Sequence, residues 1–289
     1  METGPQPRGS RGRFVVQPLH LKIALRESAL KLRTVNATRY VTPLREGGSL
    51  PAVIEADDDG MYVLKFRGAG QGRKALIAEL VAGELARAAG LPVPEIVFID
   101  LDPELARTEP DPEIQDLIRA SAGCNLALDF LPSAVTFDPL AFTPDAALAS
   151  RLVWLDGFVS NVDRTARNSN LMVWCEKLWL IDHGAALYFH HQWNGYLERA
   201  AGPFALIKDH VLLPFAGELA AADAAMTAAL TPQVIADVVA LIPDEWLEDD
   251  PLFVDPAAQR EAYRAYLCRR LQAPRAFFEE AVLARAQHL

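Results

Sequence analysis

Three polar residues in one short stretch constrain this chain most: Asp163, Asn168 and Asp182. An aspartate with an asparagine five residues later favours a tight loop, because both short side chains can turn toward one point. The apolar run 171–174 favours a β-strand, and residues 177–181 favour its hairpin partner. That hairpin brings Asp182 back to the same point. The pattern therefore predicts a polar cluster built from one loop and one hairpin.

A lone lysine lies on an earlier apolar strand. Residues 61–66 form a short β-prone run after the turn-forming residues 57–60, which predicts a β-hairpin. Lys65 is the only charged residue of this run. Such a lysine is more often an edge residue whose ammonium group reaches solvent. The alternative is a functional cation, and the polar cluster downstream favours it.

A helix is predicted directly after this strand. Apolar residues recur near a 3.6-residue period over residues 74–89, and Gly90, followed by prolines, ends the pattern. Glu79 and Glu84 both lie on this helix. Either could face Lys65, and the plain alternative is that both are solvated charges on the helix surface.

Residues 161–171 carry the most specific resemblance in the chain. They read Asn-Val-Asp-Arg-Thr-Ala-Arg-Asn-Ser-Asn-Leu, which resembles the catalytic loop of the HipA-like kinases, relatives of the phosphatidylinositol and protein kinases. The loop of that family reads Asn-x-Asp-Arg-His-x-x-Asn, and Thr165 replaces its histidine here. Asp-His-Gly at 182–184 stands where protein kinases carry Asp-Phe-Gly. The resemblance spans residues 40–187 by motif, and the C-terminal third matches only in being helical.

The resemblance implies a role for each motif residue. Asp163 would accept the proton of the phosphoryl acceptor, and Asn168 and Asp182 would hold Mg²⁺. Lys65 would contact the phosphates of ATP. A glutamate would orient that lysine, and the family spacing before a Leu-Ala pair favours Glu79 over Glu84.

Two further nucleotide contacts are expected by resemblance. A glycine-containing turn usually covers the phosphates, because bare backbone N–H groups can approach an anion closely. The turn that contains Gly47, Gly48 and Ser49 lies at the corresponding place. A second glycine cluster at 68–72 is either a phosphate contact or a plain connector, and the sequence leaves both open. Adenine is expected at the end of the strand after residue 125, with Phe130 and Leu131 as its contacts.

The expected fold is α+β and protein-kinase-like, with two lobes. A small antiparallel β-sheet with one main helix would form the N-lobe, and the C-lobe would be largely helical. Residues 1–13 are rich in glycine, proline and arginine and are expected to be disordered. Residues 14–131 would form the N-lobe and hinge, and residues 132–289 the C-lobe. The segment 102–116 is expected to be a surface loop.

The composition of the chain limits the classes of partner and the compartment that are expected. The net charge of −10 argues against an extended nucleic-acid-binding surface, which needs clustered lysine and arginine. No apolar run approaches the roughly 20 residues that a membrane-spanning helix needs. The three cysteines are far apart, which favours a reducing compartment and predicts a cytoplasmic protein. His190 and His191 are adjacent, so their side chains would point apart, and Mg²⁺ on oxygen ligands fits the chain better than a transition metal.

Three functions are compatible with these features. The first is an ATP- and Mg²⁺-dependent kinase that phosphorylates serine or threonine of a protein. The second is a kinase of the same fold acting on a small molecule or a lipid head group. The third is a non-catalytic nucleotide-binding module. The intact set Lys65, Asp163, Asn168 and Asp182 favours an active enzyme, and the sequence indicates neither the acceptor nor whether an antitoxin-like partner exists.

Overall fold

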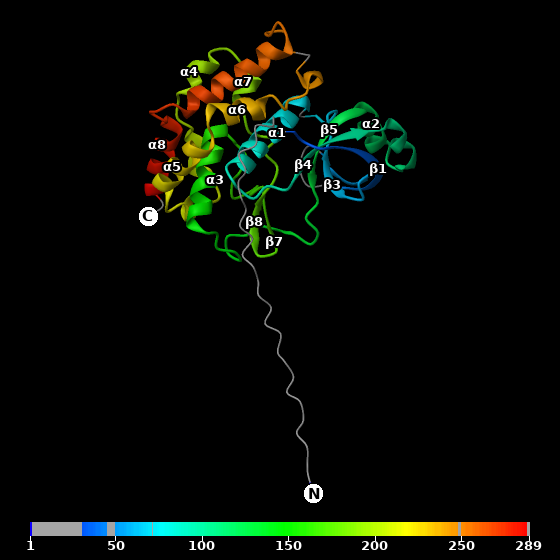
Figure 1. The fold of residues 1–289 in the computed structure, drawn as a ribbon, viewed down its shortest axis with the longest axis horizontal. Helices are drawn as coiled ribbons and strands as arrows, with labels where there is room; N and C mark the ends of the chain where they lie inside the picture. Colours follow the sequence, from blue (N-terminus) through cyan, green and yellow to red (C-terminus); the bar gives the residue numbers. More distant parts are fainter. Residues whose placement is uncertain (2–30, 45–49, 71, 248–249, 288–289) are drawn as a thin grey trace.

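The chain folds into a mixture of helices and strands. The computed structural model describes residue 1 and residues 31–44, 50–70, 72–247 and 250–287. Strands from the first half of the chain gather on one side of the molecule, and helices from the second half gather on the other (Figure 1). One long helix lies between them. The expected disorder of residues 1–13 and the turn at 45–49 lie outside the described residues, residue 1 excepted.

Five strands close into a barrel. Alternate side chains of a strand face opposite sides, and in the third strand Tyr62 and Leu64 are buried inside the barrel core. Lys65 therefore belongs to the outer face. The predicted hairpin across residues 57–60 is confirmed, with Glu55 opposite Met61. The strands are β1 (Thr34–Pro43), β2 (Ala52–Ala56), β3 (Met61–Lys65), β4 (Ile96–Leu101) and β5 (Gly123–Asp129).

The closure of this sheet corrects the prediction of a small, purely antiparallel sheet. The strand order is β1-β2-β3-β5-β4, and β1 and β4 pair in parallel, with Thr34 opposite Phe98. Strand β1 irregularly pairs with β2 between Ala37 and Arg39 and between Tyr40 and Thr42. These irregularities let one long strand bend and pair with two neighbours. Closure leaves no unpaired edge in the barrel.

The long helix α1 (Gly72–Ala88) packs between the barrel and the other helices. Its residues 76–86 are all buried, as expected for a helix covered on every side. Gly83 sits so close to β4 that a Cβ atom there would lie 2.5 Å from Ile96 Cδ1. Gly90 has a φ of +71° and ends the helix, as the sequence predicted.

A second helix corrects the prediction of a surface loop at 102–116 and of one main helix in this half. A 3₁₀ turn at Pro103–Thr108 leads into α2 (Pro112–Ala120). The side chain of Asp111 caps α2 by accepting from the N–H of Glu113, and Pro112 occupies the first turn. Because the segment 102–116 is short and acidic, this capping signal did not lead to the prediction of a helix.

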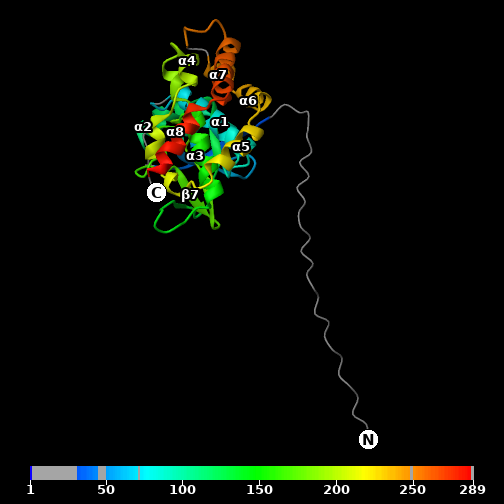
Figure 2. The same cartoon turned by 90° about the vertical axis from the view of Figure 1, so that its left-hand side faces the viewer.

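The second half of the chain is largely helical, and the predicted hairpin joins it to the barrel side. Figure 2 shows α3 (Ala146–Val159) among the other helices. Trp154 and Phe158 of this helix pack against Phe277 of α8 (Ala276–Ala286). The strands are β6 (Val135–Thr136), β7 (Leu171–Trp174) and β8 (Lys177–Leu180). The helices are α3 (Ala146–Val159), α4 (Tyr196–Ala200), α5 (Leu219–Ala229), α6 (Pro232–Val239), α7 (Pro256–Leu271) and α8 (Ala276–Ala286).

Most of these elements were predicted. The hairpin β7–β8 lies where the sequence placed it. Helical periodicity in the sequence also predicts helices over 144–159, 232–241, 255–271 and 274–286, and α3, α6, α7 and α8 lie there, within a few residues at each end. Helix α5 was not predicted. Among the described residues no single helix has the length and apolarity to cross a membrane. Only α5 and α6 together reach that measure, and they are bent by 66°.

The buried Arg270 of α7 gives a test of the packing around α3. Its guanidinium group donates to four backbone carbonyls, those of Gly157, Phe158, Ala200 and Gly202. A lysine cannot present this fork of donors. We expect Arg270→Lys to lower the free energy of unfolding by about 2–3 kcal/mol in urea denaturation. The exposed neighbour Arg269 bonds only Gln272, so Arg269→Lys is the control, and an equal loss in both variants would contradict this account.

Candidate active site

The loop with Asp163 begins at the end of α3. Ser160 ends the helix in the left-handed conformation with a φ of +54°, and its N–H bonds the carbonyl of Asp156. The chain then reverses, and Asn161 Oδ1 accepts the N–H of Asp163 at 3.1 Å. This short turn places Asp163 beside the start of β7, as the sequence pattern predicted for a tight loop.

Two amides hold one oxygen of Asp163. The Nδ2 of Asn168 lies 2.7 Å from Asp163 Oδ2, and the Nδ2 of Asn170 lies 3.4 Å from the same oxygen. Asn168 is exposed and Asn170 is buried. Because both amides contact Oδ2, they leave the other oxygen of Asp163 without a bond from either of them. The sequence analysis had placed Asn168 here and had missed Asn170.

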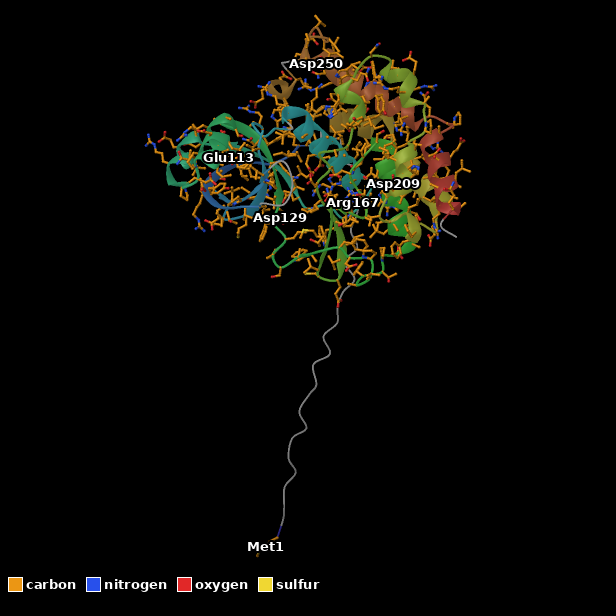
Figure 3. All side chains as sticks on the ribbon, turned by 180° about the vertical axis from the view of Figure 1, so that it is seen from behind. Met1, Glu113, Asp129, Arg167, Asp209 and Asp250 are labelled. Carbon is orange, nitrogen blue, oxygen red and sulfur yellow. The ribbon has the colours of Figure 1, made fainter. Side chains whose placement is uncertain are left out.

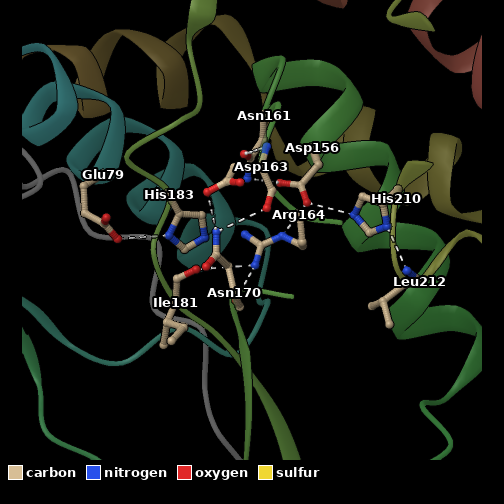
Figure 4. Close-up of polar contacts among 10 residues, drawn as sticks. All are labelled: Glu79, Asp156, Asn161, Asp163, Arg164, Asn170, Ile181, His183, His210 and Leu212. Atoms are coloured by element: carbon tan, nitrogen blue, oxygen red, sulfur yellow. Dashed lines mark hydrogen bonds and ion pairs between the residues drawn. The ribbon is translucent and has the colours of Figure 1, made fainter. Parts of the chain in front are cut away.

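A buried ion pair lies beneath this loop (Figure 4). Arg164 Nε is 2.5 Å from Asp156 Oδ2, and both side chains are fully buried. Arg164 Nη1 donates to the carbonyl of Asn170 and, at 3.4 Å, to that of Ile181. His210 Nε2 lies 2.9 Å from the same carboxylate oxygen. Burial opposes ionisation of Asp156, but Arg164 and His210 outweigh it and lower its pKa.

The hairpin returns the chain to this loop. The N–H of Ile181 donates to the carbonyl of Asn170 at 3.1 Å, which joins the end of β8 to the start of β7. Asp182 follows in the left-handed region with a φ of +53°. Such a backbone is strained in a residue other than glycine and is common at functional sites. It turns the carboxylate toward the barrel.

Lys65 meets this carboxylate from the outer face of the barrel. Its Nζ lies 2.7 Å from Asp182 Oδ1 and 3.5 Å from Glu79 Oε2. His183 Nδ1 lies 3.3 Å from the other oxygen of Glu79. Burial opposes ionisation of Glu79, but the charge of Lys65 and the bond to His183 outweigh it and lower the Glu79 pKa. Burial likewise opposes protonation of Lys65, and the two carboxylates still raise its pKa.

Glu84, the competing candidate, points elsewhere. Its Oε1 lies 3.1 Å from Arg87 Nε one turn later on α1. Burial raises the pKa of Glu84, with Arg87 acting in the opposite direction. Of the two glutamates, the structure brings only Glu79 to Lys65.

A small cavity adjoins this cluster. It is lined by Lys65, Glu79, Asp182 and Gly184 together with Ala69 and Gly72 of the second glycine cluster and by Phe66, Ala75 and Leu76. A Cβ atom at Gly72 would meet no atom within 4 Å, and Gly72 has a φ of +63°. Ala69 and Gly72 therefore lie at the cavity, and Gly72 has open space beside its backbone.

The other expected nucleotide contacts are less directly placed. Gly47, Gly48 and Ser49 lie outside the described residues. Phe130 and Leu131 follow β5 at the edge of the barrel, and the N–H of Phe130 donates to the carbonyl of Met61 at 2.9 Å. The N–H of Phe130 is therefore already used within the fold. A nucleotide base bound here would have to form any backbone hydrogen bond with a different group of this segment.

The donor set suits a hard cation. Asp182 is 41% exposed and offers a carboxylate oxygen, and Asn168 is exposed on the neighbouring loop. Carboxylate and amide oxygens match Mg²⁺, which takes few protein ligands and completes its shell with water and phosphate. The described residues contain no group of three or more His, Cys, Asp and Glu residues arranged for a metal. His190 instead packs inside the fold with Nδ1 3.0 Å from Tyr263 Oη.

The family follows from the sequence as a whole. The model of the HipA-like kinase family matches residues 38–277. The chain belongs to the HipA-like kinase family. No curated protein matches it.

Two solved kinase structures are similar to this HipA-like chain. The Helicobacter pylori proinflammatory kinase CtkA superposes with a TM-score of 0.53 at 12% identity, over 88% of this chain and 99% of that chain. The Golgi casein kinase with Mn and ADP bound gives a TM-score of 0.46 at 13% identity, over 88% of this chain and 73% of that chain. The similarity to CtkA confirms the expected kinase-like fold at the level of overall similarity.

Four residues of this site were missed by the sequence analysis: Asn170, Asp156, His210 and His183. Asp156 carried a weak signal as the only acidic residue inside the apolar helix α3. A buried carboxylate needs a partner, and Arg164 in the loop was a candidate. His210 carried no signal, because the loop that contains it has no motif. His183 was identified only as the middle residue of the Asp-His-Gly motif, and no contact was predicted for it.

The two glutamates of α1 should respond to acid with opposite signs. The lowered pKa of Glu79 means that its ionised form stabilises the fold above the usual carboxyl range, near pH 4, and that this contribution is lost as the pH falls. The raised pKa of Glu84 means that stability falls as the pH rises through that range. We expect Glu79→Gln to lower the free energy of unfolding by about 2–4 kcal/mol at pH 7 and to flatten its acid dependence.

Glu84→Gln is the matched control on the same helix. Its free energy of unfolding should fall with acid at least as steeply as that of the wild type, as measured by urea denaturation between pH 3 and 7. A flattened acid dependence in Glu84→Gln and an unchanged one in Glu79→Gln would contradict the assignment.

Proposed function

We propose that this chain transfers the γ-phosphoryl group of ATP to a hydroxyl acceptor in a Mg²⁺-dependent reaction. The observation that carries the proposal is the contact of Lys65 with both Asp182 and Glu79, which joins barrel, hairpin and α1 at one point. Asp163 lies on the neighbouring loop. In this reading the molecule has two lobes, with residues 14–131 as the N-lobe and hinge and 132–289 as the C-lobe.

Lys65 and Glu79 would serve the nucleotide phosphates. The side chain of Lys65 is only 11% exposed, so its charge is weakly screened by water. Glu79 holds it from α1, and His183 holds Glu79. Ala69 and Gly72 line the same cavity, and Gly72 would offer open backbone toward an anion, beside the expected contacts at Gly47, Gly48 and Ser49. Phe130 and Leu131 would contact the adenine.

Asp182 and Asn168 would hold Mg²⁺. When bound, the ion neutralises charge on the phosphate oxygens. Asp182 would exchange its contact with Lys65 for this role, and the lysine would keep Glu79 as its partner. Asn168 would reach the ion from the loop with its Oδ1, while its Nδ2 bonds Asp163.

Asp163 would accept the proton of the acceptor hydroxyl. Its Oδ2 is held by two amide donors, so Oδ1 would face the acceptor in a fixed orientation. Hydrogen bonds to one oxygen orient the carboxylate, and positioning supplies much of the rate in phosphoryl transfer.

The acceptor we propose is a serine or threonine of a protein, as the HipA-like family suggests. A small molecule or a lipid head group is the second candidate, since acceptor choice depends on surfaces that the catalytic loop does not specify. A non-catalytic nucleotide-binding module is the third. The completeness of the Lys65, Asp163 and Asp182 cluster supports an active enzyme over that module.

Replacing Asp163 tests the chemistry. We expect Asp163→Asn to lower kcat by about 10²–10⁴-fold, the usual contribution of a general base, with little change in nucleotide binding. Phosphoryl transfer is measured with γ-labelled ATP, and binding by calorimetry. The control is Asp116→Asn, whose side chain is 81% exposed on α2. Near wild-type turnover in Asp163→Asn would sink the assignment.

The acceptor class can be identified by where the label goes. We expect γ-phosphate on serine or threonine of a protein after incubation with labelled ATP and Mg²⁺, detected by phosphoamino-acid analysis. Label found only on an added metabolite or lipid would instead support the second candidate. The same assay with Asp163→Asn shows whether the label depends on this site.

A further inference from the structure

We propose that His210 is a positioning residue for phosphoryl transfer, acting on the catalytic loop through Asp156 and Arg164. The inference rests on the proposed function, because it concerns the same site. His210 lies about 40 residues after the loop 161–170 in the sequence, yet it adjoins this loop in the fold. Thr165 and His210 form an antiparallel β-bridge, and Figure 3, where Arg167 and Asp209 are labelled, shows the two segments side by side.

The hydrogen bonds of His210 define its protonation. The N–H of Leu212 donates to His210 Nδ1 at 3.0 Å, so that nitrogen is an acceptor. The proton of the neutral ring is therefore on Nε2, which donates to Asp156 Oδ2. Burial lowers the pKa of His210, while the carboxylate of Asp156 acts against it. A backbone group thus fixes the tautomer that bonds Asp156.

Asp156 has donors on both of its oxygens. Oδ1 accepts from Asn161 Nδ2 at 3.1 Å, and Oδ2 accepts from both Arg164 and His210. The carboxylate is fully buried, so each lost donor leaves lone pairs that water cannot satisfy. Without the imidazole donor, Oδ2 would be held by Arg164 alone, and the carboxylate could rotate with it.

Arg164 transmits this orientation to the site. Its Nη1 donates to the carbonyls of Asn170 and Ile181, while its Nη2 is buried without a hydrogen-bond partner among the described residues. The plane of the guanidinium group is therefore fixed by Nη1 and by Nε, which bonds Asp156. Asn170 contacts Asp163, and Ile181 precedes Asp182. One buried chain of contacts thus reaches both the proposed proton acceptor and the proposed metal ligand.

A backbone hydrogen bond next to His210 supports the loop independently of the His210 side chain. The N–H of Val211 donates to the carbonyl of Arg164 at 3.1 Å, and this bond does not involve the imidazole ring. A substitution of His210 that keeps the main chain in place therefore removes the donor to Asp156 while leaving this support.

Two variants of His210 isolate the bond to Asp156. Glutamine places an N–H donor at the same number of bonds from the backbone as His210 Nε2, whereas leucine places none there. Both lose the acceptor for Leu212. We expect His210→Leu to lower kcat on the order of 100-fold, with a much smaller change in the KM for ATP, and His210→Gln to recover most of that loss.

His190→Leu is the matched control. His190 is also buried, and burial lowers its pKa well below the usual value, but it bonds Tyr263 and not the Asp156 network. We expect this variant to lose stability as His210→Leu does and to keep its kcat within about threefold of the wild type. Equal kcat in His210→Leu and the wild type would overturn the inference.

Amide hydrogen exchange gives a readout that does not require activity. Exchange in residues 161–170 should accelerate in His210→Leu but not in His210→Gln or His190→Leu. Absence of transfer by the wild type would count against the proposed function, and the exchange pattern would still decide the inference. Exchange in this loop that is the same in all four proteins, or accelerates alike in all three variants, would overturn it.

Discussion

The buried pair of Arg164 and Asp156 is the interaction on which the site depends. Removing two charges from water is costly, and such a pair is favourable only when further hydrogen bonds satisfy both groups. Here Asn161 and His210 complete the carboxylate, and two backbone carbonyls accept from the guanidinium group. The conformation of the loop that contains Asp163 is therefore determined by buried side chains beneath it.

A second set of charges joins the two halves of the molecule. Lys65 comes from the barrel, Glu79 from the buried helix α1, and Asp182 from the end of the β7–β8 hairpin. The tight approach of α1 to β4 at Gly83 holds the helix against the barrel. A displacement of α1 would therefore move Glu79 away from Lys65. Packing of the core and geometry of the site are coupled through this one helix.

The sequence predicted the local parts of this structure well. Hairpins and helices follow from short-range patterns, and Asp163, Asn168 and Asp182 were expected to meet at one place. The structure joins Asn168 to Asp163, and it joins Asp182 to Lys65. Their roles toward a nucleotide remain predictions.

Features that depend on long-range contacts could not be predicted from the sequence. The parallel pairing of β1 with β4 depends on irregularities that let β1 bend. No local sequence pattern predicts these irregularities. Helix α5 is rich in alanine and lacks a clear polar face. His210 joins the loop only because the fold brings residue 210 to residue 165. Each of these depends on contacts between distant segments.

The most direct test of the central claim is thermal unfolding with ATP, with and without Mg²⁺, of the wild type and of Asp182→Asn. A ligand at about 100 times its Kd adds roughly 2.7 kcal/mol to the stability of the folded state. The account predicts that ATP stabilises the wild type in a Mg²⁺-dependent way and that Asp182→Asn loses this dependence. A wild type that shows no response to millimolar ATP with Mg²⁺, or a variant that keeps the full response, would contradict it.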